Sequence, residues 1–260
     1  MLDIVKLAFI GLVTIPTAIV VIVLGLLDAE GKMVYRIGRF WTWLILRVGG
    51  ITLKVEGLNH LDSARPYVFM VNHQSNIDIP VLIQAIRGFQ LRWIAKKELL
   101  WIPFFGWAMW ASKHILVDRA DRRNALTGLN KAKDRIRAGI SIVVFPEGTR
   151  SRDGSLMRFK KGGVLIAAQT GVPIVPVTIS GSRSVLPVGA WRVAPGTIEI
   201  FVSKPVHVEH VRSGDIRQIA LEIRRAIENN LSRSRPDDGP LSSAQSPIFV
   251  DRDSAENRSV

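Results

Sequence analysis

The chain has 260 residues, of which 47% are hydrophobic, and it carries a formal net charge of +13 at pH 7. The hydrophobic fraction is high for a soluble protein and indicates a membrane segment. There is no cysteine, which excludes disulfides, cysteine zinc sites and cysteine nucleophiles. The basic excess favours anionic partners, and because the basic residues are scattered among tryptophans and aliphatic runs, we favour lipid phosphate and the membrane surface over nucleic acid.

The first expected element is a membrane helix over residues 7–27, which carry no charge and are almost wholly apolar. A helix of this length spans about 31 Å, close to one bilayer core. A signal peptide is the alternative, but its apolar region is shorter and ends at a small-residue cleavage site. We therefore expect a retained anchor, although Gly11, Pro16 and Gly25 leave a re-entrant hairpin open.

A second helix is expected over residues 33–50, where apolar residues recur at helical spacing: Val34, Ile37, Trp41, Leu44 and Val48. Its arginines make a full membrane span costly, so an interfacial amphipathic helix fits better; a helix packed on the domain is the alternative. Lys32, Arg36 and Arg39 follow the first helix and favour a cytoplasmic location for what comes after it.

From residue 51 the pattern changes to short β-branched runs that alternate with helical stretches, which predicts an α/β domain with a mixed sheet flanked by helices. The expected strands are 51–55, 67–71, 140–145, 174–179 and 197–202, and the expected helices are 79–87, 122–138, 160–170 and 214–231. This gives a membrane region over 1–50, an α/β domain over 51–231 and a disordered tail over 232–260, where polar residues and proline dominate.

The segment most suited to chemistry is Asn72–Pro80, which follows an apolar strand and precedes a helix. His73 lies on this strand-to-helix turn, where functional side chains of α/β sheets gather. Asp78 can reach back to one imidazole nitrogen, fix the tautomer and stabilise imidazolium. His73 could then deprotonate a substrate hydroxyl as a general base. A structural histidine is the alternative, and the pair alone does not exclude it.

A second segment, Phe145–Ser151, also follows an apolar strand. Gly148 allows close backbone approach or a positive φ, and Arg150 offers a fork of donors to a phosphate. Glu147 could orient that arginine or accept from a substrate hydroxyl. A plain turn with a surface arginine is the alternative.

Two further segments accompany these. Lys96 and Lys97 precede an aromatic cluster at 101–107 that could enter lipid, line an acyl path or simply be core, and Arg119 ends a short apolar strand. The run at 172–177 contains two prolines, which predicts an edge or irregular strand.

In this order the four segments resemble the glycerolipid acyltransferase family, in particular 1-acylglycerol-3-phosphate acyltransferases, over about residues 33–230. The resemblance implies that His73 and Asp78 are the catalytic pair. It also implies that the acceptor's glycerol phosphate is bound by Lys96, Arg119, Glu147, Gly148, Thr149 and Arg150. The donor in this family is a fatty acyl thioester of coenzyme A or acyl carrier protein, and no metal or other cofactor is expected.

The product implied by the resemblance is phosphatidic acid, made by acylation at the second glycerol carbon. The expected location is a membrane, specifically the cytoplasmic side of a bacterial inner membrane. One segment departs from the family pattern: the second block reads Lys113-His114-Ile115, where the family often begins with glycine and has phenylalanine in the middle. Another acceptor, such as a lyso-ornithine lipid, therefore stays open, as does a non-enzymatic membrane-binding protein of the same fold.

Overall fold

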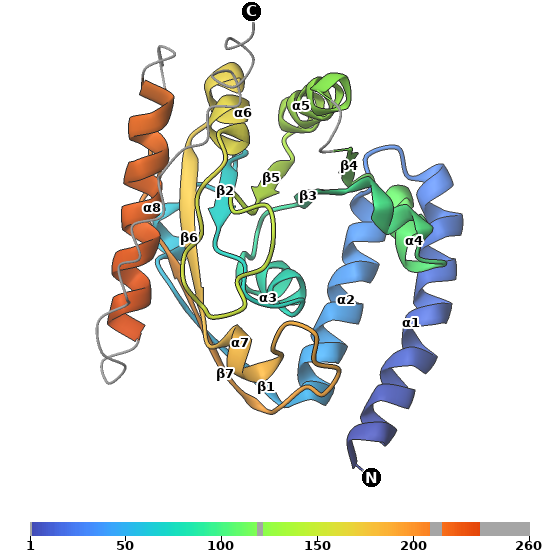
Figure 1. Ribbon diagram of the computed structural model, residues 1–260. Coiled ribbons are helices and arrows are strands. Elements are labelled where there is room, and N and C mark those ends of the chain that lie inside the picture. Colours follow the sequence, from blue (N-terminus) through green and yellow to red (C-terminus); the bar gives the residue numbers. More distant parts are fainter. Residues whose placement is uncertain (1, 119–121, 209–214, 235–260) are drawn as a thin grey trace, which may run out of the picture.

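The computed structural model describes residues 2–118, 122–208 and 215–234. Seven strands form one sheet with helices on both faces, and a helical hairpin from the N-terminus packs along one side (Figure 1). The predicted α/β architecture, a mixed sheet flanked by helices, is confirmed.

The hairpin consists of α1 (Leu2–Leu27) and α2 (Lys32–Gly49), which lie side by side (Figure 1). Pro16 lies inside α1, yet the helix is continuous, so the residues form no re-entrant hairpin. The segment Val5–Leu27 is long and apolar enough to cross a membrane, and few of its residues are buried. Such an exposed apolar helix indicates membrane association.

The turn between the two helices is held by charged side chains. The Asp28 carboxylate accepts hydrogen bonds of 2.6–3.1 Å from the backbone N–H groups of residues 31–34, which satisfies the free donors at the start of α2. Lys113 Nζ donates to the carbonyl of Gly25 at 2.9 Å, and the buried Arg92 guanidinium donates to the two carbonyls that precede α2. Lys113 lies at the negative end of α1.

Helix α2 packs on the domain, as the second reading of its sequence proposed, and its interfacial role stays a prediction. Its buried side chains include Val34 and Leu46, and it packs against α3 and β1. Phe40 and Trp43 are exposed, and their rings stack with centroids 5.8 Å apart. The helix is therefore packed on the domain along one face and presents aromatic rings on another.

The sheet has the order β1-β7-β6-β2-β5-β3-β4. Only the β6–β7 pair is antiparallel, and the other paired strands are parallel. The carboxyl ends of β6, β2, β5, β3 and β4 therefore meet at one edge. The strands are β1 (Ile51–Glu56), β2 (Val68–Val71), β3 (Leu91–Lys96), β4 (Ile115–Val117), β5 (Ser141–Val144), β6 (Ile174–Ser180) and β7 (Gly196–Val202).

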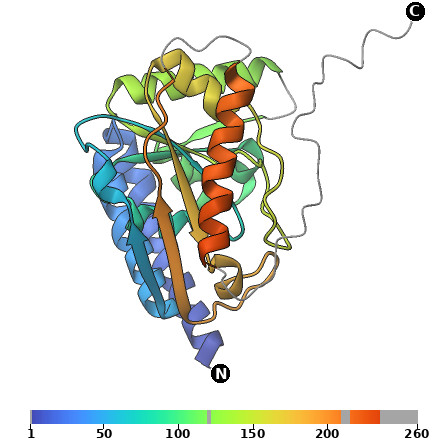
Figure 2. The same cartoon turned by 90° about the vertical axis from the view of Figure 1, so that its left-hand side faces the viewer.

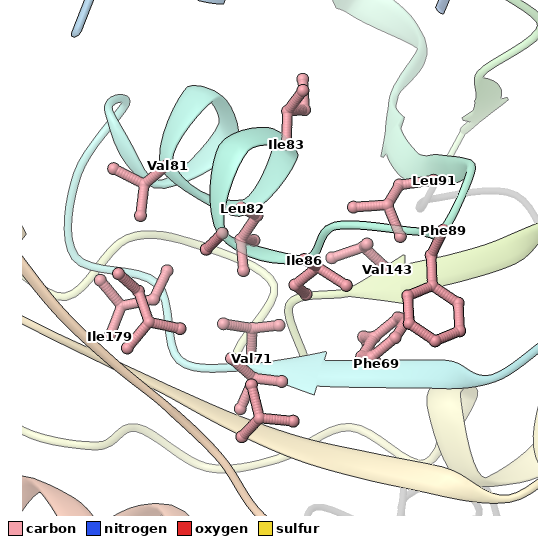
Figure 3. Close-up of a cluster of buried hydrophobic side chains, with 14 of the residues drawn as sticks. Phe69, Val71, Val81, Leu82, Ile83, Ile86, Phe89, Leu91, Val143 and Ile179 are labelled. Carbon is pink, nitrogen blue, oxygen red and sulfur yellow. The ribbon is translucent and has the colours of Figure 1, made fainter. Parts of the chain in front are cut away.

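Helices cover the two faces of the sheet because alternate strand residues point in opposite directions. In β2, Phe69 and Val71 belong to the core beneath α3, whereas Val68 and Met70 belong to the core beneath α5, α6 and α8 (Figure 3). Figure 2 shows α8 in front of β6, against which it packs. These helices are α3 (Asp78–Ala85), α5 (Arg122–Arg137), α6 (Gly162–Thr170) and α8 (Asp215–Ser234).

The four helices and five strands predicted from 51 onward all occur, within three residues of the predicted bounds. Strand β3 was not predicted.

The short elements are the 3-10 helices η1 (Leu58–His60) and η2 (Lys97–Trp101), with α4 (Phe105–Ala111) and α7 (Ser182–Val185). The aromatic cluster lies on η2 and α4, and Trp101, Phe104, Phe105 and Trp107 are exposed, so these rings are not core.

The prediction of an edge or irregular strand at the two prolines was wrong, because β6 lies between β7 and β2 in the sheet. Its register explains why Pro176 is tolerated. The carbonyl of Pro176 accepts from the N–H of Ser203, which lies beyond the end of β7. The N and C=O of one strand residue point to the same side. The nitrogen of Pro176, which carries no hydrogen to donate, therefore faces the chain just beyond the last residue of β7 and costs the β6–β7 pair no hydrogen bond.

The C-terminal boundary lies close to the predicted one. Helix α8 continues to Ser234, three residues into the segment expected to be a disordered tail from 232. Residues 235–260 lie outside the described part of the chain, so the tail stays a prediction, as does the division into a membrane region and a catalytic domain.

A buried amide gives the first testable prediction. Asn72 follows β2, and its side chain accepts from the N–H of Ile179 at 2.8 Å and donates to the same residue's carbonyl at 2.9 Å. Asn72→Ala leaves both buried groups unpaired, so the free energy of unfolding should fall by about 2 kcal/mol. Thermal unfolding in detergent measures it. Asn230→Ala is the control, because its bonds of 3.2–3.4 Å to hydroxyl groups are long and only partly buried; an equal loss in both variants contradicts the assignment.

Candidate active site

His73 lies on the turn between β2 and α3, at the edge where the parallel strands end. Its Nδ1 is 2.8 Å from Oδ2 of Asp78, the first residue of α3. The imidazole is 14% exposed and the carboxylate is fully buried. The carboxylate favours the tautomer with the proton on Nδ1. Nε2 makes no hydrogen bond to the residues that the structure describes, so its lone pair is open to a ligand.

The Asp78 carboxylate also shapes the turn. Its Oδ2 accepts from the backbone N–H groups of Gln74 and Ser75, at 2.8 and 2.9 Å. These donors and the N-terminus of α3 stabilise the negative charge in a buried place. The hydroxyl of Ser75 donates to the carbonyl of Leu186 at 2.6 Å, which ties the turn to the loop after α7.

The second predicted segment packs directly on His73. The ring of Phe145 stacks on the imidazole with centroids 3.8 Å apart and an angle of 12° between planes. The N–H of His73 donates to Glu147 Oε1, and its carbonyl accepts from the N–H of Ser151, both at 2.8 Å. The 145–151 loop therefore fixes the ring and the backbone of His73.

Glu147 is buried and bonds to backbone on both oxygens. Oε1 accepts from His73, and Oε2 accepts from the N–H of Met157 at 3.0 Å. Burial, with a smaller contribution from the nearby Asp78 carboxylate, raises the pKa of Glu147 to about 7 against the lowering effect of these two bonds. Both carboxylate oxygens of Glu147 thus hold backbone N–H groups, one of them that of His73.

Arg150 lies at the end of the same loop, where its Nη1 donates to Asn76 Oδ1 at 2.8 Å. Gly148 adopts a φ of 77°, and a Cβ there would meet Lys160 Nζ at 2.6 Å, so the turn requires glycine. Thr149 is exposed between them. Arg150 and Asn76 join the two loops across the opening beside His73.

Of the two remaining predicted binding residues, Lys96 lies farther along the same edge. Lys96 ends β3, is exposed, and pairs with Glu98 at 2.8 Å. Arg119 lies just outside the described residues, after β4 and Asp118. Strand order therefore brings the first three predicted segments to one edge, in the sequence β2, β5, β3 and β4.

Sequence reasoning missed three contributors to this site. Phe145 was predicted to end a strand and begin the loop segment, but no role in the site was assigned to it, to Asn76 or to Ser75. Phe145 stacks on His73, and the other two form hydrogen bonds across the site. Only their position inside the two segments could have pointed to them. Among the described residues no cluster of three or more potential metal ligands occurs.

An apolar cavity of about 140 Å³ lies between the hairpin and α3. It reaches Ile79, the neighbour of Asp78, and is lined on the other sides by Ala18, Trp41 and Phe105 among others. The site is thus adjacent to apolar space beneath α1 and α2.

Comparisons with known proteins agree with this geometry. The Acyltransferase family model matches residues 52–180. The 1-acyl-sn-glycerol-3-phosphate acyltransferase of Pseudomonas aeruginosa is 32% identical over 206 residues, which are 78% of this chain and 76% of that protein. The chloroplastic enzyme LPAT1 of Arabidopsis thaliana is 37% identical over 157 residues, 60% of this chain but 44% of its own length. The chain therefore spans less than half the length of that plant relative.

The crystal structure of the lysophosphatidate acyltransferase PlsC from Thermotoga maritima superposes with a TM-score of 0.75 at 27% identity, and covers 91% of this chain and 96% of that one. The resemblance drawn from the sequence segments is confirmed. Because the chain aligns with three quarters of the bacterial relative at 32% identity and matches the family model through both loops of the site, it belongs to the acyltransferase family.

Proposed function

We propose that the chain transfers a fatty acyl group from an acyl thioester to the sn-2 hydroxyl of 1-acylglycerol-3-phosphate, giving phosphatidic acid. The observation that carries the proposal is the 2.8 Å contact between His73 and the buried Asp78, with Nε2 open beside a loop that presents Arg150. The names of the relatives support the same reaction. The apolar cavity next to Ile79 is space of the kind that an acyl chain needs.

In the proposed reaction His73 Nε2 takes the proton of the acceptor hydroxyl as its oxygen attacks the thioester carbonyl. Asp78 stabilises the imidazolium that forms. The tetrahedral intermediate then collapses, the C–S bond breaks, and the departing thiolate takes the proton from His73. One ester bond replaces one thioester bond, and the imidazole returns neutral.

We assign the acceptor's phosphate to Arg150, with Gly148 and Thr149 beside it and Lys96 farther along the edge. We assign Arg119, which lies outside the described residues, to the same group from its sequence alone. Glu147 was expected to bind substrate as well. Since both of its oxygens hold backbone N–H groups, we propose that it positions His73.

The segment that departs from the family pattern, Lys113-His114-Ile115, lies in the interior. His114 accepts from the N–H of Trp93 at 3.3 Å, and burial, together with the Arg92 and Arg135 cations, lowers its pKa to about 3. Lys113 bonds to α1. Both residues support packing rather than acceptor recognition, so this segment gives no reason to prefer another lysolipid over a phosphate-bearing one.

The experiment that tests the reaction is His73→Ala. With the general base removed, kcat for acyl transfer to lysophosphatidate should fall by about 10²–10⁴, because the hydroxyl must lose its proton unaided. His60→Ala is the control, since His60 is exposed on η1. Product formation by purified protein measures both. Activity of His73→Ala within a factor of two of wild type contradicts the mechanism.

Arg150→Ala tests the binding assignment. Losing a charged donor to phosphate should raise the KM for lysophosphatidate about tenfold and leave the KM for the acyl donor unchanged. Arg65→Ala is the control, because Arg65 is exposed and pairs with Asp62 away from the site. A fall in kcat alone, with KM unchanged, removes Arg150 from the acceptor site.

We also propose that the protein resides in a bacterial inner membrane, with the site on the cytoplasmic side. Support comes from the exposed apolar α1 and from Lys32, Arg36 and Arg39 after it.

The chain has no cysteine, so Ser63→Cys, at an exposed position, adds a unique label site. A membrane-impermeant maleimide should label it only in permeabilised cells; labelling in intact cells contradicts the orientation, and the wild-type chain controls for background.

A further inference from the structure

A second cavity, lined in part by charged side chains, lies beside the His73 turn and extends from the loop that carries Arg150 to the loop after α7. It has a volume of about 620 Å³ and is lined by Arg152, Arg183, Ser184, Pro187, Val188 and Gly189. Arg152 comes from the loop after β5, and the remaining residues come from α7 and the loop after it. Strands β5 and β6 flank β2 in the sheet, so the two walls of this Arg152–Arg183 cavity stand on either side of the His73 turn.

Hydrogen bonds connect both walls to the turn. Ser151, next to Arg152, donates its N–H to the carbonyl of His73 at 2.8 Å. Leu186, next to Pro187, accepts from the hydroxyl of Ser75 at 2.6 Å. The cavity is therefore separated from the His73 turn by one residue on each side.

The charge of the cavity suits an anion. Its lining contains two arginines and no acidic residue. Arg183 is partly buried and is held by a 2.9 Å bond from Nη1 to the carbonyl of Asp153. Arg152 is exposed and makes no hydrogen bond or ion pair within the part of the chain that the structure describes. The neighbouring Asp153 carboxylate is engaged by the hydroxyls of Ser151 and Ser155 and by a backbone N–H.

The order of sites along the sheet edge indicates which substrate approaches here. Arg150 follows β5 and Lys96 ends β3, and both are assigned to the acceptor. The acceptor therefore reaches His73 from the β5 and β3 side of β2. The thioester must reach the same imidazole, because the hydroxyl attacks its carbonyl. Arg183 and Pro187 lie on the β6 side of His73, which is left for the thioester's carrier.

We propose that the Arg152–Arg183 cavity binds phosphate groups of the carrier that delivers the acyl thioester. The inference rests on the proposed acyl transfer. Guanidinium groups match phosphate oxygens through paired hydrogen bonds, while Pro187 and Val188 offer an apolar wall to the arm that links phosphate to sulfur. Coenzyme A carries nucleotide phosphates and a pantetheine phosphate, and acyl carrier protein carries the pantetheine phosphate alone.

The test compares donors that differ only in phosphate. Palmitoyl-CoA, palmitoyl-4′-phosphopantetheine and palmitoyl-pantetheine are assayed with Arg152→Glu and Arg183→Gln, at saturating lysophosphatidate. The ratio of kcat/KM for palmitoyl-CoA to that for palmitoyl-pantetheine should fall about tenfold in each variant, through KM, as expected for a lost charged contact. The KM for lysophosphatidate should not change.

Arg87→Glu is the matched control for Arg152→Glu. It makes the same change of charge at an exposed position just past the far end of α3, and its donor ratio should equal that of wild type. If kcat/KM for palmitoyl-4′-phosphopantetheine, relative to palmitoyl-pantetheine, also falls in the arginine variants, the cavity binds the pantetheine phosphate, which both carriers share. If kcat/KM falls only for palmitoyl-CoA, the cavity binds the nucleotide phosphates of coenzyme A.

Two results overturn the proposal: an unchanged donor ratio, or a rise confined to the KM for lysophosphatidate, which assigns the cavity to the acceptor. Titration of coenzyme A and of pantetheine into wild type and the folded variants measures the affinity of the cavity without turnover. If wild type transfers no acyl group but binds coenzyme A more weakly after either arginine change, the proposed function fails and the cavity assignment stands. If coenzyme A binding is equal in wild type and variants, the cavity assignment fails by itself.

Discussion

The Asp78 carboxylate has no water contact, and a buried charge is costly unless hydrogen bonds and a positive partner compensate for it. Its compensation comes from the turn that carries His73: two backbone N–H groups and the imidazole Nδ1 all point at Oδ2. The same three contacts therefore stabilise the charge, define the turn and orient the ring.

The surrounding layers hold this arrangement in place. Phe145 stacks on the imidazole and Glu147 holds the backbone of His73, so the strand next to β2 restrains the turn from the side. Asn72 binds β2 to β6 from the other side. In the proposed mechanism this rigidity matters because proton transfer requires the Nε2 lone pair to face the acceptor hydroxyl within about 3 Å.

The hairpin connects this site to lipid. Asp28 caps the start of α2, Lys113 bonds a carbonyl in the last turn of α1, and Arg92 bonds the two carbonyls that precede α2. Arg92 belongs to β3, so the sheet itself holds the membrane-associated helices. Burial lowers the pKa of Arg92 to about 10, yet the guanidinium stays charged at neutral pH and binds carbonyl groups in place of a carboxylate.

The sequence was informative wherever a pattern repeats along the chain. Amphipathic helices such as α5 and α8 and β-branched strands such as β2 follow from periodicity, and His73, Asp78 and Arg150 follow from their place after apolar strands. Strand β3 was missed because Arg92 interrupts its apolar run. The burial of Arg92 is explained by its carbonyl partners and by the Tyr35 ring beneath the guanidinium, which lie far away along the chain. The backbone partners of Glu147 could not be predicted, because His73 lies 74 residues away along the chain. The interior position of Pro176 depended on where β7 ends, which no local pattern encodes.

The most direct test of the central claim is the kinetics of Asp78→Asn. The asparagine keeps the shape and can still accept backbone N–H bonds, but it removes the charge that stabilises imidazolium. The proposed mechanism predicts a fall in kcat of about 10³–10⁴, with the KM for lysophosphatidate and the Tm close to those of wild type. A folded Asp78→Asn variant whose kcat stays within about tenfold of wild type contradicts the claim that the charge of this carboxylate drives the reaction.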